Sequence, residues 1–226
     1  MRVILGNLRR LFVNSRPQMP AYQLVLLTAL FILVANNQTF WRHVLTIFEG
    51  RPPNLMIFGG IGFCVILFSI ALLAFPYMQR IALALLVILA SVSAYYQDYL
   101  GIVIDEDMLQ NVINTTSNEA KHLITLPFVM RVVFYGVLPA LLILWVKITP
   151  SKWWKQILVY FATWILAFVM FLGLVFSDFR TNSSVIREHR EMNFSIQPSA
   201  PLSGGFNYIK RMFRSTNLVV APLGTD

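Results

Sequence analysis

The chain has 226 residues, of which 57% are hydrophobic and only 12% are charged. Soluble domains usually carry about 25% charged residues, so the composition excludes an ordinary water-soluble enzyme and indicates a protein whose solvent is lipid. A net charge of +8 in a soluble protein could indicate nucleic-acid binding. Here the Lys and Arg residues lie at the ends of apolar segments and in one tail, which favours membrane lipids as partners and not nucleic acid.

Five segments are long and apolar enough to cross a bilayer, which requires roughly 20 residues. The first follows Pro20 and ends in the polar run Asn36-Asn37-Gln38, and the fourth contains Pro139, where we expect a kink. The predicted fold class is therefore an all-α membrane protein with five transmembrane helices. The expected spans are 21–41, 55–75, 81–99, 128–146 and 154–176.

The orientation and a transport function can both be assessed from the charges. Most Lys and Arg residues of the short loops lie on the side of the N-terminal arm, which predicts a cytoplasmic N-terminus and an outer C-terminus. The predicted spans have no ionisable side chain at their centres. Because ion pathways and proton relays need such groups, the sequence argues against a channel or a pump.

A long outer loop, 97–127, separates the third and fourth spans. Asp105 precedes Glu106 and Asp107, an order typical of a helix start, because acidic side chains favour the positive end of the helix dipole. Apolar residues follow at helical spacing, so we expect an amphipathic helix that lies along the outer membrane surface. These residues are Met108, Leu109, Val112 and Ile113.

Asn111, Thr115 and Glu119 follow one another at intervals of four residues and would form one polar stripe on an unbroken helix. Such a stripe could bind a zwitterionic lipid headgroup, with the Glu119 carboxylate facing the ammonium group. Alternatively, Thr116 and Glu119 match a capping box, which would start a second helix and change the geometry of the stripe. The spacing leaves both interpretations open.

The tail, 177–226, contains a Pro/Ser/Gly-rich stretch at 197–205 and then a predicted short basic helix at 206–214 on the membrane surface. The three histidines, His43, His122 and His189, are scattered along the chain, and the sequence contains no familiar catalytic motif. We therefore expect no catalytic residue, metal ligand or cofactor site in this chain.

The outer loop resembles that of a known family, the bacterial phosphoethanolamine–lipid A transferases, which include the mobile colistin-resistance enzymes. The five predicted spans agree with the N-terminal membrane domain of that family. In the tail, Asp178, the run 187–190, Pro198 and the closing 223–226 add weaker similarity. The loop residues that carry the resemblance are Gly101-Ile102-Val103-Ile104-Asp105, Met108, Asn111, Thr115-Thr116 and Glu119-Ala120.

Members of that family move phosphoethanolamine from phosphatidylethanolamine to lipid A at the periplasmic face of the bacterial inner membrane, and the cationic product lowers the affinity for polymyxins. The resemblance implies that Asn111, Thr115 and Glu119 line the donor-lipid cavity. It also implies that 1–176 is the membrane domain and that 177–226 is a periplasmic bridge toward a zinc-containing catalytic domain absent from this chain.

This chain alone should then be inactive. The alternative is a stand-alone accessory or regulatory inner-membrane protein. The residues leave the acceptor open between lipid A, a core sugar and a glucan.

Overall fold

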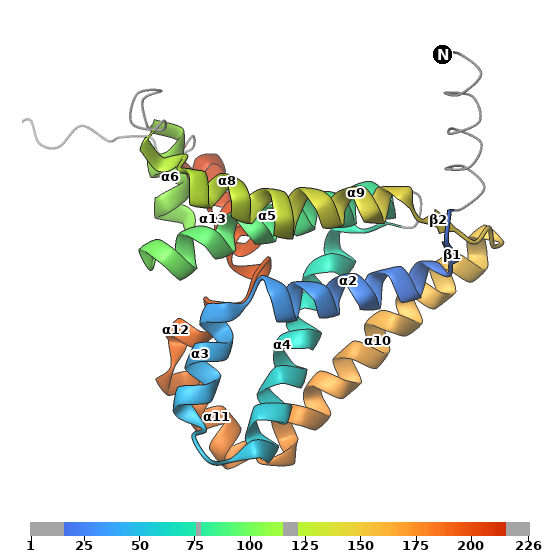
Figure 1. Cartoon of the computed structure of the whole chain (residues 1–226). Helices are drawn as coiled ribbons and strands as arrows, with labels where there is room; N and C mark the ends of the chain where they lie inside the picture. Colours follow the sequence, from blue (N-terminus) through green and yellow to red (C-terminus); the bar gives the residue numbers. More distant parts are fainter. Residues whose placement is uncertain (1–15, 76–77, 115–121, 216–226) are drawn as a thin grey trace, which may run out of the picture.

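The computed structural model describes residues 16–75, 78–114 and 122–215 (Figure 1). Within these ranges four helices are long and apolar enough to cross a membrane, and a bent pair of helices makes a fifth candidate span. The predicted helical membrane fold is thereby confirmed. The four spans are α4 (Pro52–Leu73), α5 (Gln79–Leu100), the composite of α8 (Leu126–Val132), η1 (Val133–Val137) and α9 (Leu138–Trp145), and α10 (Trp153–Ser177).

The first span is not the single helix expected over 21–41. Helix α2 (Ala21–Ala35) ends at two asparagines, and α3 (Gln38–Ile47) continues after a bend of 67°. Asn36 and Asn37 are both buried, and their side-chain amides donate to backbone carbonyls of distant segments. At the bend, side chains satisfy the last carbonyls of α2 in place of a continuing helix, since the Asn37 amide donates to the Ile32 carbonyl and the Trp41 ring N–H to the Leu33 carbonyl, both at 2.9 Å.

The fourth span contains a π-helical turn, η1, immediately before Pro139. Proline has no backbone N–H, so the carbonyl four residues earlier, that of Tyr135, loses its helical partner. The Asn36 side-chain amide donates to this carbonyl at 3.4 Å. The irregularity expected at Pro139 is therefore present as a widened turn, and the bend of the first span supplies the missing donor.

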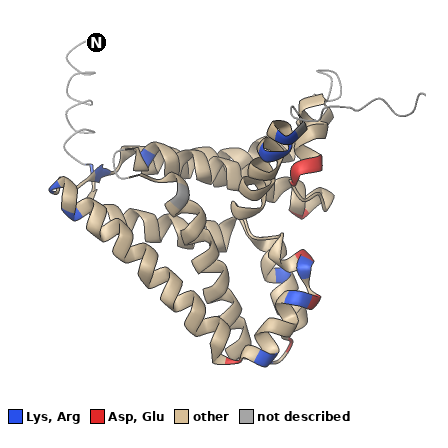
Figure 2. Cartoon of the chain, turned by 180° about the vertical axis from the view of Figure 1, so that it is seen from behind, with Lys and Arg blue, Asp and Glu red and all other residues tan. Residues whose placement is uncertain are grey.

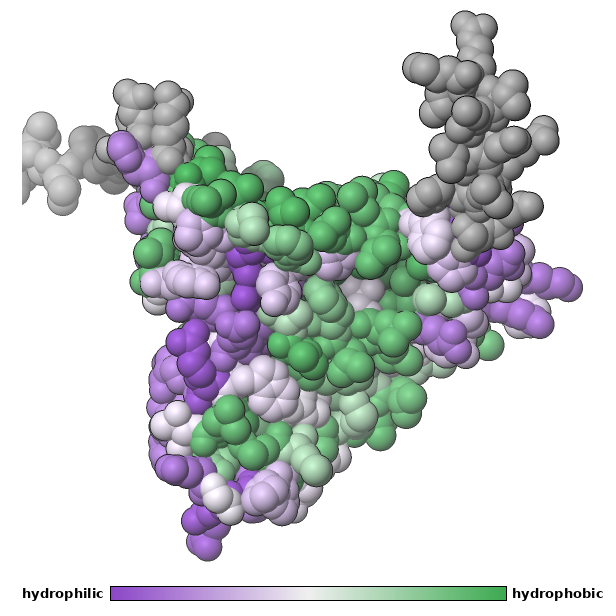
Figure 3. All heavy atoms as spheres, in the orientation of Figure 1, coloured by the Kyte–Doolittle hydropathy of each residue, from purple (hydrophilic) through white to green (hydrophobic). Residues whose placement is uncertain are grey.

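The hydrophobic core lies between α2, α4 and α5, where Ile32, Ile66 and Val87 are fully buried. Helix α10 lies against α4, and the Phe68 ring meets the Trp164 ring edge-on with centroids 5.5 Å apart. Apolar side chains also cover the outer surfaces of α2, α9 and α10 (Figure 3). An apolar exterior of this kind is expected for helices that are surrounded by lipid.

One end of the bundle is closed by a short parallel pair of strands, β1 (Gln18–Met19) and β2 (Lys147–Ile148). Figure 2 shows basic residues at this end without described acidic residues beside them, and Arg80 donates to the Val146 carbonyl there at 3.1 Å. We call this region the Lys-rich end. Its basic residues are Arg16, Arg80, Lys147, Lys152 and Lys155.

The tail forms three helices at the opposite end, where α12 packs beside α3 and α13 packs beside α6 (Glu106–Asn114) (Figure 1). The predicted basic helix at 206–214 is part of a longer helix, because α13 begins at Ser199 and includes most of the Pro/Ser/Gly-rich stretch. Pro201 is tolerated since the first N–H groups of a helix have no partner within it. The tail helices are α11 (Phe179–Glu188), α12 (Arg190–Asn193) and α13 (Ser199–Ser215).

Candidate functional site

A polar cluster at the bend of the first span is centred on Asp98, near the end of α5. The Asp98 carboxylate is 5% exposed and accepts hydrogen bonds from the Thr39 N–H at 3.1 Å and from Thr39 Oγ1 at 2.6 Å. Arg131 Nη2 lies 3.3 Å from one carboxylate oxygen, and Arg42 Nη2 lies 3.4 Å from the other. These four contacts compensate the buried carboxylate for its lost hydration.

Arg131 connects the cluster to both halves of the bend. Its guanidinium donates to the Ala35 carbonyl, the last of α2, at 3.0 Å. The same group lies 4.5 Å from the centre of the Tyr135 ring, a cation–π arrangement. Its side chain is only 10% exposed, whereas that of Arg42 is 62% exposed. Arg131 is thus the inner partner of Asp98, and it fixes α5, α8 and the end of α2 to one another.

A second set of hydrogen bonds attaches the tail to the spans. The Gln197 N–H donates to Asn37 Oδ1 at 2.7 Å, and Asn37 Nδ2 donates to the Gln197 carbonyl at 3.1 Å. The Gln197 side chain donates to Gln97 Oε1 at 2.8 Å. All three residues are buried. Since Asn37 and Gln197 are 160 residues apart, this exchange fixes the tail to the first and third spans.

Several buried polar atoms of the cluster retain unused hydrogen-bonding capacity. Asn36 Oδ1, Arg131 Nε and Gln197 Oε1 have no hydrogen-bond partner within the part of the chain that the structure describes. Buried polar atoms are normally paired, so the cluster can accommodate a further polar group or a bound water molecule.

Helices α6 and α13 form a second polar contact at the same end of the molecule. Arg211 Nη1 of α13 lies 3.1 Å from a Glu106 oxygen and 3.0 Å from an Asp107 oxygen. The hydrogen bonds that Arg211 donates to Asp107 and Glu106 hold the pKa of its guanidinium above its ordinary value. A Cβ at Gly204 would lie 2.9 Å from both the Asp105 carbonyl carbon and the Ile104 oxygen, so only glycine permits this close approach.

The predicted start of the loop helix is confirmed. The Asp105 carboxylate accepts a hydrogen bond from the Met108 N–H at 2.9 Å, which is the geometry of an N-cap. The acidic pair after it has two roles, since Glu106 and Asp107 occupy the first turn and also bind Arg211. The position of α6 on an outer membrane surface stays a prediction.

The structure describes only one residue of the predicted polar stripe. Asn111 lies in α6 and is exposed. Thr115 and Glu119 lie outside the described residues, and so does Thr116 of the alternative capping box. Whether the three stripe residues face one ligand therefore stays a prediction, as does the second helix.

The described residues do not fit a metal centre, because no group of three His, Cys, Asp or Glu side chains converges among them. In the polar cluster the Thr39 hydroxyl lies beside the Asp98 carboxylate, but two arginines bind the same carboxylate. The chemistry of the cluster is that of a scaffold, in which charged and amide groups hold the bend, two spans and the tail in one arrangement.

The residues of this cluster were not singled out from sequence as a site. Arg131 is visible as a charge inside an apolar segment, and Asn36 and Asn37 as amides at the end of another. Such residues are costly in lipid unless they are paired. Their presence in apolar segments was therefore the sequence feature that could have indicated a buried polar cluster. Asp98 carried no such signal, because it lies beside the polar loop.

Comparisons with known proteins extend over most of the chain. The family model described as phosphoethanolamine transferase EptA/EptB matches residues 62–213. Phosphatidylethanolamine transferase Mcr-2 of Escherichia coli is 31% identical over 182 residues, which cover 78% of this chain and 33% of that protein. Phosphoethanolamine transferase EptA of Escherichia coli K12 is 28% identical over 220 residues, which cover 94% of this chain and 40% of that protein.

A solved structure resembles the fold closely. It is the integral membrane lipooligosaccharide phosphoethanolamine transferase A (EptA) of Neisseria meningitidis, with a TM-score of 0.82 and 25% identity. The match covers 89% of this chain and 38% of that chain. This chain therefore spans about a third to two fifths of the length of its relatives. From the family match, the sequence similarity and the shared helical arrangement, we conclude that the chain belongs to the EptA/EptB phosphoethanolamine transferase family.

Proposed function

We propose that this chain is the membrane domain of a phosphoethanolamine transferase that moves phosphoethanolamine from phosphatidylethanolamine to lipid A. In this role it anchors a catalytic domain that follows the tail, and it helps to bind the donor lipid. Family membership supports this function over a stand-alone accessory protein. In this proposal the zinc of the reaction belongs to the catalytic domain.

The observation that carries the proposal is the attachment of the tail. A membrane domain that presents lipid to a following domain must hold the connecting segment in a fixed position. Asn37 and Gln97 bind Gln197 through three hydrogen bonds of 2.7–3.1 Å between buried groups. Seven residues later, Gly204 lies against the backbone at the start of α6. The tail therefore leaves the bundle directly beside the helix that bears Asn111.

The proposed membrane is the bacterial inner membrane, with the N-terminus in the cytoplasm and the tail in the periplasm. The Lys-rich end supports this orientation, because basic loops are retained in the cytoplasm. In the proposed function, Asn111, Thr115 and Glu119 bind the donor headgroup near the periplasmic surface. Glu119 faces the ammonium group, and the neutral side chains face the phosphate or glycerol oxygens.

Mass spectrometry of lipid A from cells that express the full-length protein tests the proposal. We expect an added phosphoethanolamine group and a raised polymyxin tolerance. Separate N111A, T115A and E119A variants should reduce the modified fraction at unchanged protein levels. Gln110→Ala is the matched control, because Gln110 is exposed on the same helix beside Asn111. Normal modification in the E119A variant would remove Glu119 from the donor site, and unmodified lipid A with abundant wild-type protein would refute the function.

A further inference from the structure

A half-enclosed crevice of about 270 Å³ lies between α2, α4 and α10, at the Lys-rich end of the bundle. This volume is near the lower limit of about 300 Å³ for small-molecule pockets, so it holds an elongated segment and not a whole lipid. Its walls are apolar and come from helices that face the membrane. They include Val25, Leu67, Ile70, Val159 and Trp164.

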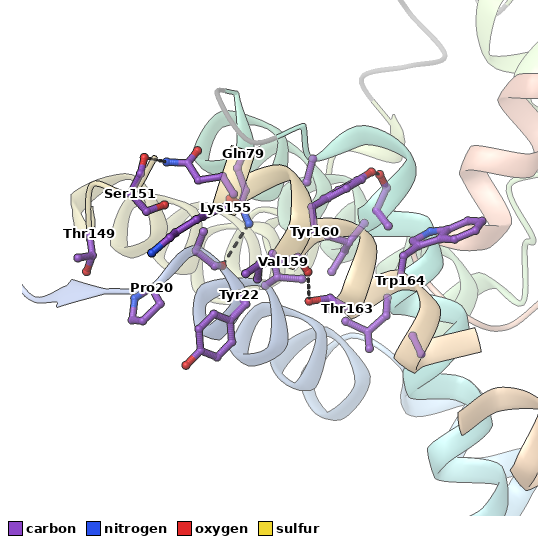
Figure 4. Close-up of a pocket in the computed structure, with 18 residues that line it drawn as sticks. Pro20, Tyr22, Gln79, Thr149, Ser151, Lys155, Val159, Tyr160, Thr163 and Trp164 are labelled. Carbon is purple, nitrogen blue, oxygen red and sulfur yellow. Dashed lines mark hydrogen bonds between the residues drawn. The ribbon is translucent and has the colours of Figure 1, made fainter. Parts of the chain in front are cut away.

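Polar groups gather at one end of the crevice, which we call its mouth, where Figure 4 shows Gln79, Thr149, Ser151 and Lys155. Gln79 is held in place by a hydrogen bond to the Ala21 carbonyl at 3.1 Å, and Gln156 by one to the Ser151 carbonyl at 3.1 Å. The Lys155 ammonium lies 5.5 Å from the centre of the Trp154 ring. An apolar slot with a polar, cationic rim matches a molecule with one apolar chain and an anionic head.

The charge around the mouth is uniformly positive. Lys155 lines the crevice, and Lys147 and Lys152 lie close to it in the chain. Within the described ranges none of these three lysines forms an ion pair. Figure 2 shows the described acidic residues away from this corner of the molecule. Since juxtamembrane lysines attract anionic lipids, these unpaired positive charges favour a lipid with an anionic headgroup over a neutral one.

From these observations we propose that the crevice binds one acyl chain of an anionic phospholipid, whose phosphate group contacts Lys155. The helices on both sides are spans, so the chain enters from the surrounding lipid without crossing water. This site lies at the end of the bundle opposite to α6 and the tail. It is thus separate from the proposed donor site. The donor lipid there is zwitterionic, whereas the lipid proposed for the crevice is anionic.

Native mass spectrometry of the full-length protein with added phosphatidylglycerol or phosphatidylcholine of identical acyl chains tests the site. We expect one phosphatidylglycerol to be retained in preference to phosphatidylcholine. One lysine near the surface contributes about 1 kcal/mol to anionic-lipid binding, so Lys155→Gln should weaken retention about fivefold. Lys147→Gln removes the same charge at the same end but outside the crevice lining, and it should have less than half that effect.

A second pair of variants tests the crevice itself. Val159→Trp places a large side chain inside it and should abolish retention of phosphatidylglycerol. Leu158→Trp adds the same side chain at the neighbouring position, which is 62% exposed and outside the lining, and should leave retention unchanged. Equal retention of the two lipids, or equal effects of the two lysine variants, would overturn the proposal. If V159W does not fold, the lysine pair decides alone, since Lys155 is exposed.

Discussion

The two arginines that share the Asp98 carboxylate allow a direct test of what burial contributes to this fold. Both guanidinium groups lie at nearly equal distances from it, 3.3 Å for Arg131 and 3.4 Å for Arg42. Their exposed fractions differ sixfold, 10% against 62%. Removing one partner of a buried pair costs about 3–5 kcal/mol, because the other charge is left unpaired. An exposed pair contributes about 0–1 kcal/mol.

We therefore expect Arg131→Met to lower the free energy of unfolding by roughly 3 kcal/mol, at the lower limit because Thr39 and Arg42 still bind the carboxylate. Arg42→Met should lower it by less than about 1 kcal/mol. At about 2–4 °C per kcal/mol for a chain of this size, the R131M variant should melt roughly 6–12 °C below the wild type.

Thermal unfolding in detergent micelles, followed by circular dichroism, measures both variants. In the D98A background the effect of R131M should shrink, because the two residues belong to one network. Equal losses of stability from R131M and R42M would refute the assignment of Arg131 as the buried partner of Asp98 and of Arg42 as the exposed one.

Three further perturbations test the tail. Gly204→Ala should separate α13 from α6, because the new Cβ would lie 2.9 Å from backbone atoms. Gly205→Ala is the control and should be tolerated, since its Cβ would lie 4.0 Å from its nearest neighbour. We expect faster hydrogen exchange in α6 for the Gly204 variant alone. Asn37→Ala leaves buried tail groups unpaired at about 1–3 kcal/mol, so exchange should rise around 197, and unchanged protection would contradict the role of this residue. A hydrogen bond from its own backbone N–H, and a smaller contribution from a hydrogen bond with His189, hold the pKa of Glu191 below its ordinary value. The stability that these hydrogen bonds give is fully present when the pH is above the ordinary pKa, and it is lost as the pH falls through the lowered pKa. His189→Ala should raise the pKa of Glu191 part of the way back in an NMR titration of the carboxylate, and no change would show that His189 is not a cause.

Hydropathy was sufficient to predict the four unbroken spans, because a helix in lipid must be apolar along most of its length. The borders of α4 and α5 differ from the expected ones by three residues or fewer at each end. The break at Asn36–Asn37 was missed because amides at the end of an apolar run are equally typical of a membrane interface. Only the distant acceptors of these amides, the carbonyls of Tyr135 and Gln197, distinguish a buried helix break from a membrane interface.

The candidate site was less accessible to sequence reasoning than the spans. The pairing of Asp98 with Arg131 depends on how two spans lie side by side, and no local pattern encodes it. The interpretation of the acidic residues after Asp105 as a helix start is confirmed, because capping is a local property. Their binding to Arg211 joins segments about a hundred residues apart, and no local pattern predicts such a contact.

The short first helix has a consequence for the membrane around the protein. The 15 residues of α2 reach only about 22 Å at 1.5 Å per residue, against a hydrocarbon thickness of about 30 Å. Such a hydrophobic mismatch is relieved by local thinning of the bilayer. If α2 begins at one membrane surface, Arg131, which binds the last carbonyl of α2, lies at a depth where an undeformed membrane would still be hydrocarbon. The lipid surface beside α2 should form a depression, and headgroups there would come level with the buried polar cluster.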